Sequence, residues 1–436
     1  MDGDMNIERY TCEIKTPVWT GDIDSKSDLV KSTGIIGSLR WWTEAILRGM
    51  DYFICDPTEE KNQCPIKGNN NESAKYCCAC LIFGASGIRR IFKMYIDGGE
   101  KVFSDKTLNI RPSGRNRGWY LGSGLKGELN LNIVSLDKEF KREFVLVPLA
   151  ISANWGAIGA KTQHGYGVIK LNDKIGGDFT GFKSGIENVI NSNRFKNLKI
   201  KIRTGNNDCF PNIKEMFFTK VQFKAQNNWW RNIDSIKNNA SDQRITDWIN
   251  SGSVPISPEI KNWLRYGGGQ ELWKTCDQNK DSGIENWLFG TTQRVCRYCF
   301  NKVRNDNRNQ NNYWCENCKK SLKPEETMER MASKINISCA YKIDGDLWEF
   351  RVWGWIPKNG NPSWFVRDKF LDGLKASLNS TGTVYLQWNN LLGNQTTNHS
   401  LVVWREFDSN RDTVKSNEKN IGNFLNDLID DKEVAG

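Results

Sequence analysis

The sequence contains very little histidine. Only His164 and His399 occur among its 436 residues, so enzymes built on clustered histidines are excluded. It also lacks the Gly-x-Ser-x-Gly nucleophile elbow, the His-Glu-x-x-His metalloprotease helix and the Gly-Lys-Ser/Thr end of a nucleotide P-loop. Whatever chemistry the chain has must therefore come from other residue types.

Long apolar runs and a signal-like N-terminus are also missing. No window approaches the 18 or so uninterrupted apolar residues of a membrane helix, and we expect a cytoplasmic protein. In a reducing compartment, 13 cysteines favour metal sites or buried thiols over disulfides.

What is present suits a multidomain globular protein with an anionic partner. A length of 436 residues indicates two or three domains, and 38% hydrophobic residues are enough for real cores. The net charge of +10 is moderate, and no single helix carries a long basic run, so any basic surface must be assembled by the fold. The 18 tryptophans can pack cores or stack on unpaired bases.

One early stretch, Lys15–Arg48, has the pattern of a strand, a polar loop and an amphipathic helix. Gly34 and Gly37 are placed just before the helix, where main-chain N–H groups can approach a phosphate. Lys31 and Arg40 flank this entry. An ordinary β–loop–α unit with a solvated charged face explains the same pattern.

A later glycine-rich passage, residues 154–170, reads NWGAIGAKTQHGYGVIK. Its glycines surround Lys161, Gln163, His164 and Tyr166, so the loop can present N–H groups, one cation and one ring to a phosphate chain. A tight turn between core elements is the alternative.

The strongest motif is a pair of CxxC knuckles, Cys296-x2-Cys299 and Cys315-x2-Cys318. Four thiolates in this spacing predict a structural Zn²⁺ site with no open coordination position.

A second, less regular set consists of Cys55, Cys64, Cys77 and Cys80. Cys78 can replace Cys77 in this set, and buried thiols without metal are the alternative to a second zinc ion.

Three residues are candidates for catalysis. Asp22 and Asp24 follow the first strand and can hold a divalent metal, although loop aspartates usually form turns. His164 can act as a general acid or base in RNA cleavage, but a lone histidine in a glycine loop more often bonds or stacks.

Two tetrapeptides echo each other in the two halves. Leu81-Ile82-Phe83-Gly84 and Trp287-Leu288-Phe289-Gly290 are both interpreted as strands, which suggests two related α+β halves.

Together, TPVWTGD followed by TGIIGSLRWWTEAILRG, the LIFG and WLFG segments, and the late Gly-Tyr-Gly loop resemble the RAMP superfamily. Members of this superfamily build the ribonucleoprotein complexes of type III CRISPR systems. The motifs are most similar to the two-domain subunit that caps the crRNA 3′ end in the type III-B (Cmr) complex.

The resemblance implies an α+β fold with two ferredoxin-like (RRM-like) RAMP domains and zinc-ribbon insertions. We place the domains at 1–197, with a Cys-rich insertion at about 51–80, and at 198–436, with a ribbon at about 294–320. The crRNA-contact candidates carried over from the family are Ser38, Arg40, Lys161, Gln163, His164 and Tyr166. Candidates added on charge and placement are Lys31, Arg89, Arg90, Arg111, Arg115 and Arg117.

The function implied is a non-catalytic, prokaryotic RNA-binding subunit with crRNA, target RNA and other RAMP subunits as partners. Its cofactor would be structural Zn²⁺, with one ion expected at the CxxC pair and room for a second at the less regular set. The alternative is an endoribonuclease that uses Asp22 or Asp24 on target RNA, or His164 in crRNA processing.

Overall fold

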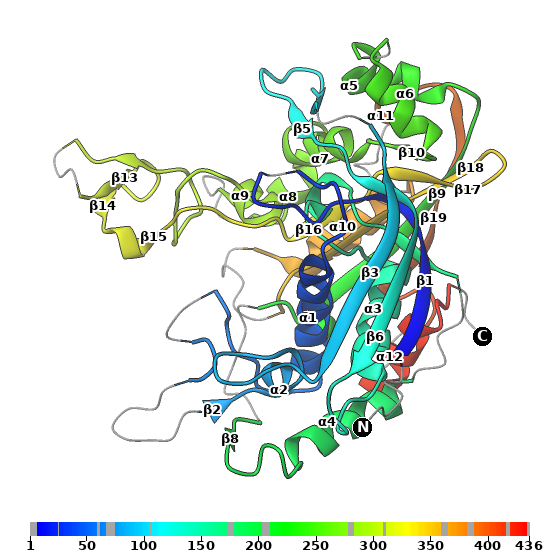
Figure 1. Cartoon of the computed structure of the whole chain (residues 1–436). Helices are drawn as coiled ribbons and strands as arrows, with labels where there is room; N and C mark the ends of the chain where they lie inside the picture. The colour runs from blue at the N-terminus through cyan, green and yellow to red at the C-terminus, as the bar shows by residue number, and fades with distance from the viewer. Residues whose placement is uncertain are drawn as a thin grey trace.

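The computed structural model covers thirteen stretches of the chain (Figure 1). They are residues 7–24, 26–58, 62–66, 75–103, 106–172, 178–202, 210–239, 241–277, 283–307, 311–358, 365–381, 388–415 and 419–433. Within these stretches, no helix combines the length and the apolar character needed to cross a bilayer.

The first domain has the strand order of a ferredoxin-like fold. Its elements are β1 (Ile7–Val18), α1 (Ser32–Gly49), β3 (Phe92–Lys101), β6 (Leu125–Ser135), α3 (Glu143–Trp155) and β7 (Ile169–Leu171). They form a sheet in the order β3-β6-β1-β7, with every neighbouring pair antiparallel. This βαββαβ arrangement confirms the predicted α+β class and the ferredoxin-like fold for this half.

The second domain repeats that order. Its main elements are β9 (Met216–Ala225), α7 (Ser257–Tyr266), β16 (Ile335–Ile337), β17 (Ala340–Asp344), β18 (Leu347–Trp355), α10 (Arg367–Leu378) and β19 (Thr396–Glu406). The sheet runs β17-β18-β9-β19, with β10 (Ser253–Val254) added at one edge and β16 also paired with β18. The chain therefore contains two copies of one topology.

The two echoing tetrapeptides are helical, so their interpretation as strands was wrong. They end α2 (Cys78–Phe83) and α9 (Ile284–Phe289), and both helices stop at a glycine with positive φ, 88° at Gly84 and 74° at Gly290. A short apolar run cannot be assigned to strand or buried helix by periodicity alone. The echo is nevertheless structural, because each helix precedes the second main strand of its domain.

The domains meet along a seam of main-chain and arginine contacts. The Cys339 N–H donates to the Gly165 carbonyl at 3.0 Å. The buried Arg351 donates from Nη1 to the carbonyls of Ala153 (2.6 Å) and Gly156 (3.2 Å), which lie at the C-terminal end of α3. A cation suits this end of a helix, where carbonyls lack intrahelical partners.

Two segments assigned by sequence to 198–436 lie against the first domain. Strand β8 (Lys199–Ile200) pairs with β2 (Lys75–Tyr76), and α12 (Ile421–Ile429) packs on α3 and on α4 (Phe179–Ile190). The Trp155 indole donates to the Leu428 carbonyl at 2.8 Å. The chain end thus returns to the first domain.

The CxxC segment projects from the body of the molecule (Figure 1). It contains β11 (Val295–Cys296) paired with β15 (Thr327–Met328), and the small sheet β12 (Arg304–Asn305), β13 (Tyr313–Cys315) and β14 (Lys320–Leu322). Its buried apolar cluster is separate from the two domain cores.

The seam predicts a specific sensitivity at Gly165. Its φ is +95°, and an added Cβ would lie 2.5 Å from the Cys339 nitrogen, whereas Gly114, at φ +73°, has nothing within 4 Å. Alanine at either position forces an L-residue into left-handed backbone, at about 1–2 kcal/mol. Gly165→Ala should be destabilised by roughly 1–3 kcal/mol more through overpacking. Urea unfolding of both variants measures the difference, and equal destabilisation would contradict this account of the seam.

Candidate functional site

A cleft of about 640 Å³ lies between the two domains. The first wall is α1, which contributes Gly34, Gly37, Ser38, Trp41 and Trp42, and the second is the glycine-rich loop at 157–163. The third wall comes from the other domain, at residues 332–336 and 353–355. The two stretches singled out in the sequence therefore face the same cavity.

The two first-domain walls are fixed to each other. The Ser38 hydroxyl accepts the Gly159 N–H at 2.8 Å, and the Trp42 indole donates to the Ala157 carbonyl at 3.2 Å. Gly156 permits this approach, because an added Cβ there would lie 2.3 Å from the Trp42 ring. Ser38 lines the cleft as predicted, but its hydroxyl is engaged in holding the loop.

The cleft lining is cationic and aromatic, and the described residues that form it include no acidic side chain. Lys161 lies 3.9 Å above the Trp19 ring, and burial lowers its pKa. Lys334 lies 5.3 Å from the Trp355 ring on the opposite wall. Trp41, with 38% of its surface exposed, offers a ring to the opening. Such a lining suits an anionic ligand with planar groups.

Helix α1 starts earlier than the sequence suggested. It begins at Ser32, so Gly34 and Gly37 lie inside its first turns instead of before them. Lys31 is the N-cap residue and is exposed, and the first turn contains no acid. Gly37 still presents bare backbone to the cleft, because nothing lies within 4 Å of the position that a Cβ would take.

Arg40 faces away from the cleft. Its Nε donates to Glu44 at 2.9 Å, Nη1 to the Gly84 carbonyl at 3.1 Å, and Nη2 to the Cys80 sulfur at 3.2 Å. All three guanidinium nitrogens are engaged inside the first domain. This placement argues against the RNA contact predicted for Arg40.

Tyr166 is fully buried, and its hydroxyl donates to the Gly122 carbonyl at 2.6 Å. Its ring lies 5.5 Å from that of Trp248 in the second core, so it is a packing residue. Gln163 is exposed at the cleft.

His164 packs edge-on against Trp119 at 5.1 Å. Burial, with Lys261 and Lys161 nearby, lowers its pKa to about 4. The imidazole is therefore neutral near pH 7, and it does not have the near-neutral pKa that suits a general acid.

The arginines predicted on charge lie outside the cleft lining. Arg111, Arg115 and Arg117 are exposed on the loop before β5 (Trp119–Leu121), where Arg115 stacks 3.9 Å from the Tyr266 ring. Arg89 is exposed and Arg90 half-buried, beyond the end of α2.

The early aspartates shape a turn. Asp22 Oδ1 accepts the N–H groups of Asp24 (3.1 Å) and Lys26 (2.9 Å), and Asp24 is exposed. Among the described residues, the groups of three or more side chains placed to hold a metal ion are the two cysteine groups. Asp22 and Asp24 belong to neither. This is the turn-forming alternative recognised for these residues.

Lys334, Asn336 and Trp355 line the cleft but were not singled out from the sequence. They lie on or beside β16 and β18, which reach the cleft only because the domains pack across the seam. The sequence offered one signal for this wall of the cleft, the Trp-Gly-Trp at 353–355. Because Gly354 has no Cβ, β18 can approach the Lys334 carbonyl and the Phe217 ring.

Both cysteine sets converge in space. In each, the four sulfurs lie within 4.8 Å of one another. Measured pairs are 3.6 Å for Cys55–Cys80, 3.7 Å for Cys296–Cys318 and 3.5 Å for Cys299–Cys315. Sulfurs held at about 2.3 Å from a tetrahedral Zn²⁺ lie about 3.8 Å apart, so both groups fit the metal.

The choice between Cys77 and Cys78 is settled by geometry in favour of Cys77, which is in the group. Hydrogen bonds among the thiols lower the pKa of Cys55 and Cys77 and raise the pKa of Cys64 and Cys80. In the second group, such hydrogen bonds lower the pKa of Cys299 and raise the pKa of Cys296. The convergence of four sulfurs, and not the pKa of any one thiol, therefore identifies each group.

Residues 11–170 match the family described as the RAMP superfamily, so the predicted resemblance is confirmed for this segment. The match runs from β1 into β7 and thus coincides with the first ferredoxin-like domain. A comparison with curated protein sequences finds no match.

Three solved structures are similar to the chain. The crystal structure of apo Cmr1 from Pyrococcus furiosus is 14% identical, with 84% of this chain and 96% of that chain covered and a TM-score of 0.34. A chain of the Type III-B Cmr-beta complex bound to cognate target RNA and AMPPnP is also 14% identical, with 85% and 98% covered and a TM-score of 0.34. Cmr6 from Pyrococcus furiosus is 13% identical, with 40% and 100% covered and a TM-score of 0.24. The fold assignment rests on strand order, since these overall superpositions are loose.

The cysteine geometry predicts two tetrahedral metal sites per chain. Metal analysis of the purified protein should return two equivalents, and Cys80→Ser and Cys318→Ser should each lower the value to about one, because a structural site needs all four thiolates. Cys78→Ala is the matched control and should retain two. Two equivalents in Cys80→Ser, or none in the unmodified protein, would contradict the assignment.

Proposed function

From the RAMP-superfamily domain and the interdomain cleft, we propose that this protein is a non-catalytic RNA-binding subunit of a type III-B CRISPR (Cmr) ribonucleoprotein. In this proposal it holds the 3′ region of the crRNA, helps to admit target RNA, and docks on other RAMP subunits. The match at residues 11–170 and the motif resemblance support the family assignment. The cleft supports the RNA-binding role.

The single observation that carries the RNA-binding role is the composition of the cleft. Among the described residues that line it are two lysines and four tryptophans from both domains, and no carboxylate. Phosphates are attracted by the lysines, and unstacked bases can lie on Trp41 and Trp355. These contacts are to phosphates and to the faces of bases, which carry little sequence information. RNA binding would therefore be nearly independent of sequence and would weaken strongly as salt is added.

The non-catalytic assignment is supported by the candidate residues themselves. Asp22 caps a turn with its carboxylate, and His164 is neutral and packed beside Trp119. Neither arrangement supplies a paired metal site or a base poised near neutral pH.

For the two cysteine groups we propose Zn²⁺ in a structural role. Four thiolates leave no open coordination position, so the metal would fix the surrounding loops and perform no chemistry. The ribbon buries only a small apolar cluster, so metal binding would supply much of the free energy that keeps it folded.

The cleft assignment predicts which substitutions weaken RNA binding. Trp41→Ala should cost about 1–3 kcal/mol of affinity for single-stranded RNA, because it removes a ring on which a base can stack. Lys161→Ala with Lys334→Ala should reduce the slope of log affinity against log salt by about 0.7 for each phosphate that the lysines no longer neutralise. Fluorescence anisotropy over a range of salt concentrations measures both quantities.

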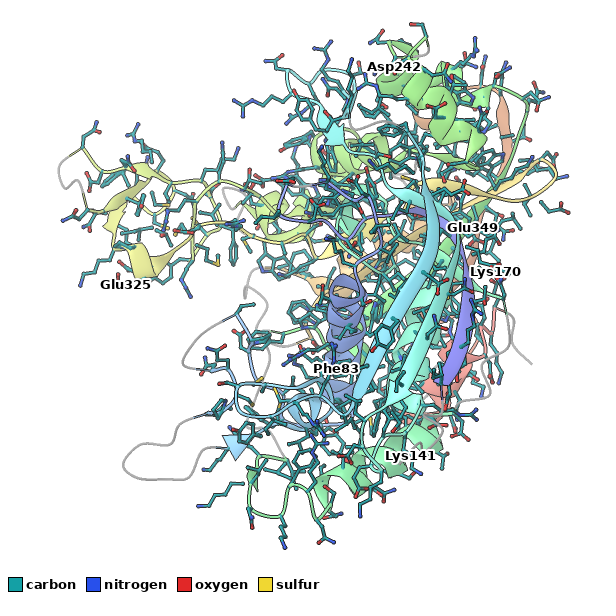
Figure 2. The ribbon with its side chains drawn as sticks, in the orientation of Figure 1. Phe83, Lys141, Lys170, Asp242, Glu325 and Glu349 are labelled. Atoms are coloured by element: carbon teal, nitrogen blue, oxygen red, sulfur yellow. The ribbon has the colours of Figure 1, made fainter. Side chains whose placement is uncertain are left out.

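The matched control is Lys170→Ala. This exposed lysine lies on β7, away from the cleft lining (Figure 2). It removes one positive charge, as each of the two cleft lysine substitutions does, and should change neither the affinity at moderate salt nor the slope by the amount expected for one cleft lysine. Cleft variants that bind as tightly as the control would refute the proposed interface.

The non-catalytic assignment has its own test. Bound RNA incubated with Mg²⁺ or Mn²⁺ should stay intact with the unmodified protein and equally with Asp22→Asn, Asp24→Asn and His164→Gln. Denaturing gels of end-labelled RNA report cleavage. Cleavage that disappears in one variant while binding persists would establish the endoribonuclease instead.

A further inference from the structure

Helix α1 carries two faces with different tasks. Gly37, Ser38 and Trp41 line the cleft. Arg40, Glu44 and Arg48, spaced four residues apart, form a row on another face of the helix. Helix α2, which supplies Cys78 and Cys80, packs against α1, and Figure 2 labels its last residue, Phe83, beside α1.

These three charged side chains of α1 connect the first cysteine group to the cleft wall. Arg40 contacts the Cys80 sulfur at 3.2 Å and the Glu44 carboxylate at 2.9 Å. Arg48 lies 3.6 Å from the other oxygen of Glu44 and donates to the Pro211 carbonyl at 3.1 Å. Pro211 itself lines the cleft. A largely buried chain of contacts made by charged side chains thus runs from a sulfur of the first cysteine group to the cleft.

Charge balance explains why the row needs the metal site. Four thiolates around a divalent ion carry a net charge of −2, and the row carries two arginines against one glutamate. Arg48 and Glu44 are nearly fully buried, and the Arg40 side chain is 23% exposed. Buried charges are tolerated when they are paired, and the cysteine group can supply the counter-charge for the one arginine charge that Glu44 does not balance.

The second cysteine group has a different surrounding. Sulfurs of both groups accept main-chain N–H groups, from Cys77 to Cys64 at 3.2 Å in the first, and from Tyr298 to Cys296 and from Cys318 to Cys315 at 3.4 Å in the second. Asn301 is the side-chain amide near Cys299, at 3.8 Å. Among the described contacts of the two groups, an arginine therefore donates to a cysteine sulfur in the first group and not in the second.

We propose that Arg40 is a positioning residue that couples metal binding at Cys55, Cys64, Cys77 and Cys80 to the placement of α1. Arg40 ties α1 to the Cys80 sulfur, so a metal ion that fixes this sulfur would also hold α1 in the register in which Ser38 fixes the Gly159 loop. The first site thereby sets the shape of the cleft. The consequence for RNA rests on the proposed function, whereas the coupling between the metal and α1 stands on its own.

The metal arm of the test uses the full chain with Cys315→Ser, which leaves only the first group able to bind metal. Cobalt(II) is the probe, because its thiolate charge-transfer and d–d absorption bands report tetrahedral sulfur coordination, and competition with a chelator gives the affinity. Arg40→Gln, which removes the charge, should weaken cobalt binding about 10–100-fold, the usual effect of losing a residue that supports a metal ligand. Arg40→Lys should recover part of the affinity.

Arg89→Gln is the matched control, because Arg89 is exposed, lies five residues beyond Gly84 and belongs to the same domain. Its cobalt affinity should equal that of the parent. If Arg40→Gln proves too unstable to purify, Arg40→Lys keeps the test, because lysine retains the charge but cannot make all three guanidinium contacts, so its cobalt affinity should still fall below that of Arg89→Gln. Affinities for Arg40→Gln and Arg40→Lys equal to that of Arg89→Gln overturn the proposal.

The positioning arm needs no RNA. Hydrogen exchange measured with and without metal should show faster exchange in α1 and in residues 157–163 when the metal is removed, with β19 as the internal reference. Unchanged exchange in α1 overturns the coupling. RNA binding is then measured on the same samples: a protein with metal-dependent exchange that binds no RNA in either state refutes the proposed function and leaves the coupling supported.

Discussion

The architecture depends on how closely the glycine-rich loop of one domain approaches a strand connection of the other. The Cys339 N–H reaches the Gly165 carbonyl, and there is no room for a Cβ at Gly165. Arg351 adds a buried cation at the C-terminal end of α3. Together these contacts fix the second sheet against the first, and the cleft exists because of that arrangement.

The same loop therefore serves the fold and the site at once. Tyr166, in the later part of the loop, packs into the core of the second domain. Residues 157–163, in the earlier part, line the cleft, and the Gly159 N–H donates to the Ser38 hydroxyl. Movement of the loop would alter both the seam and the cleft. A residue in this loop can have a strong effect on ligand binding without touching the ligand, which is how we interpret Tyr166.

Much of this organisation is visible in the sequence, and the part that is not has a common physical reason. The two glycine-containing stretches, the two cysteine sets and the paired α+β halves follow from local spacing and patterning. The roles of Arg40 and Tyr166 do not, because a cationic or aromatic residue near a glycine turn looks the same whether it faces a ligand or a neighbouring helix. Lys334 and Trp355 were missed because they reach the cleft only through contact between the domains. The LIFG and WLFG helices were mistaken for strands, since a run of three apolar residues satisfies both periods.

The two cysteine groups differ in what they support. The first is part of the first domain's core, where its cysteines pack with α1 and α2, whereas the second forms its own small cluster with Leu322 in the projecting ribbon. Losing metal from the second should therefore disorder the ribbon and leave both sheets intact. Loss of metal from the first would change one of the three contacts that hold the Arg40 guanidinium, next to the helix that lines the cleft. Two sites with the same ligands thus have unequal consequences, because one is embedded in the structure that forms the cleft and the other stands outside it.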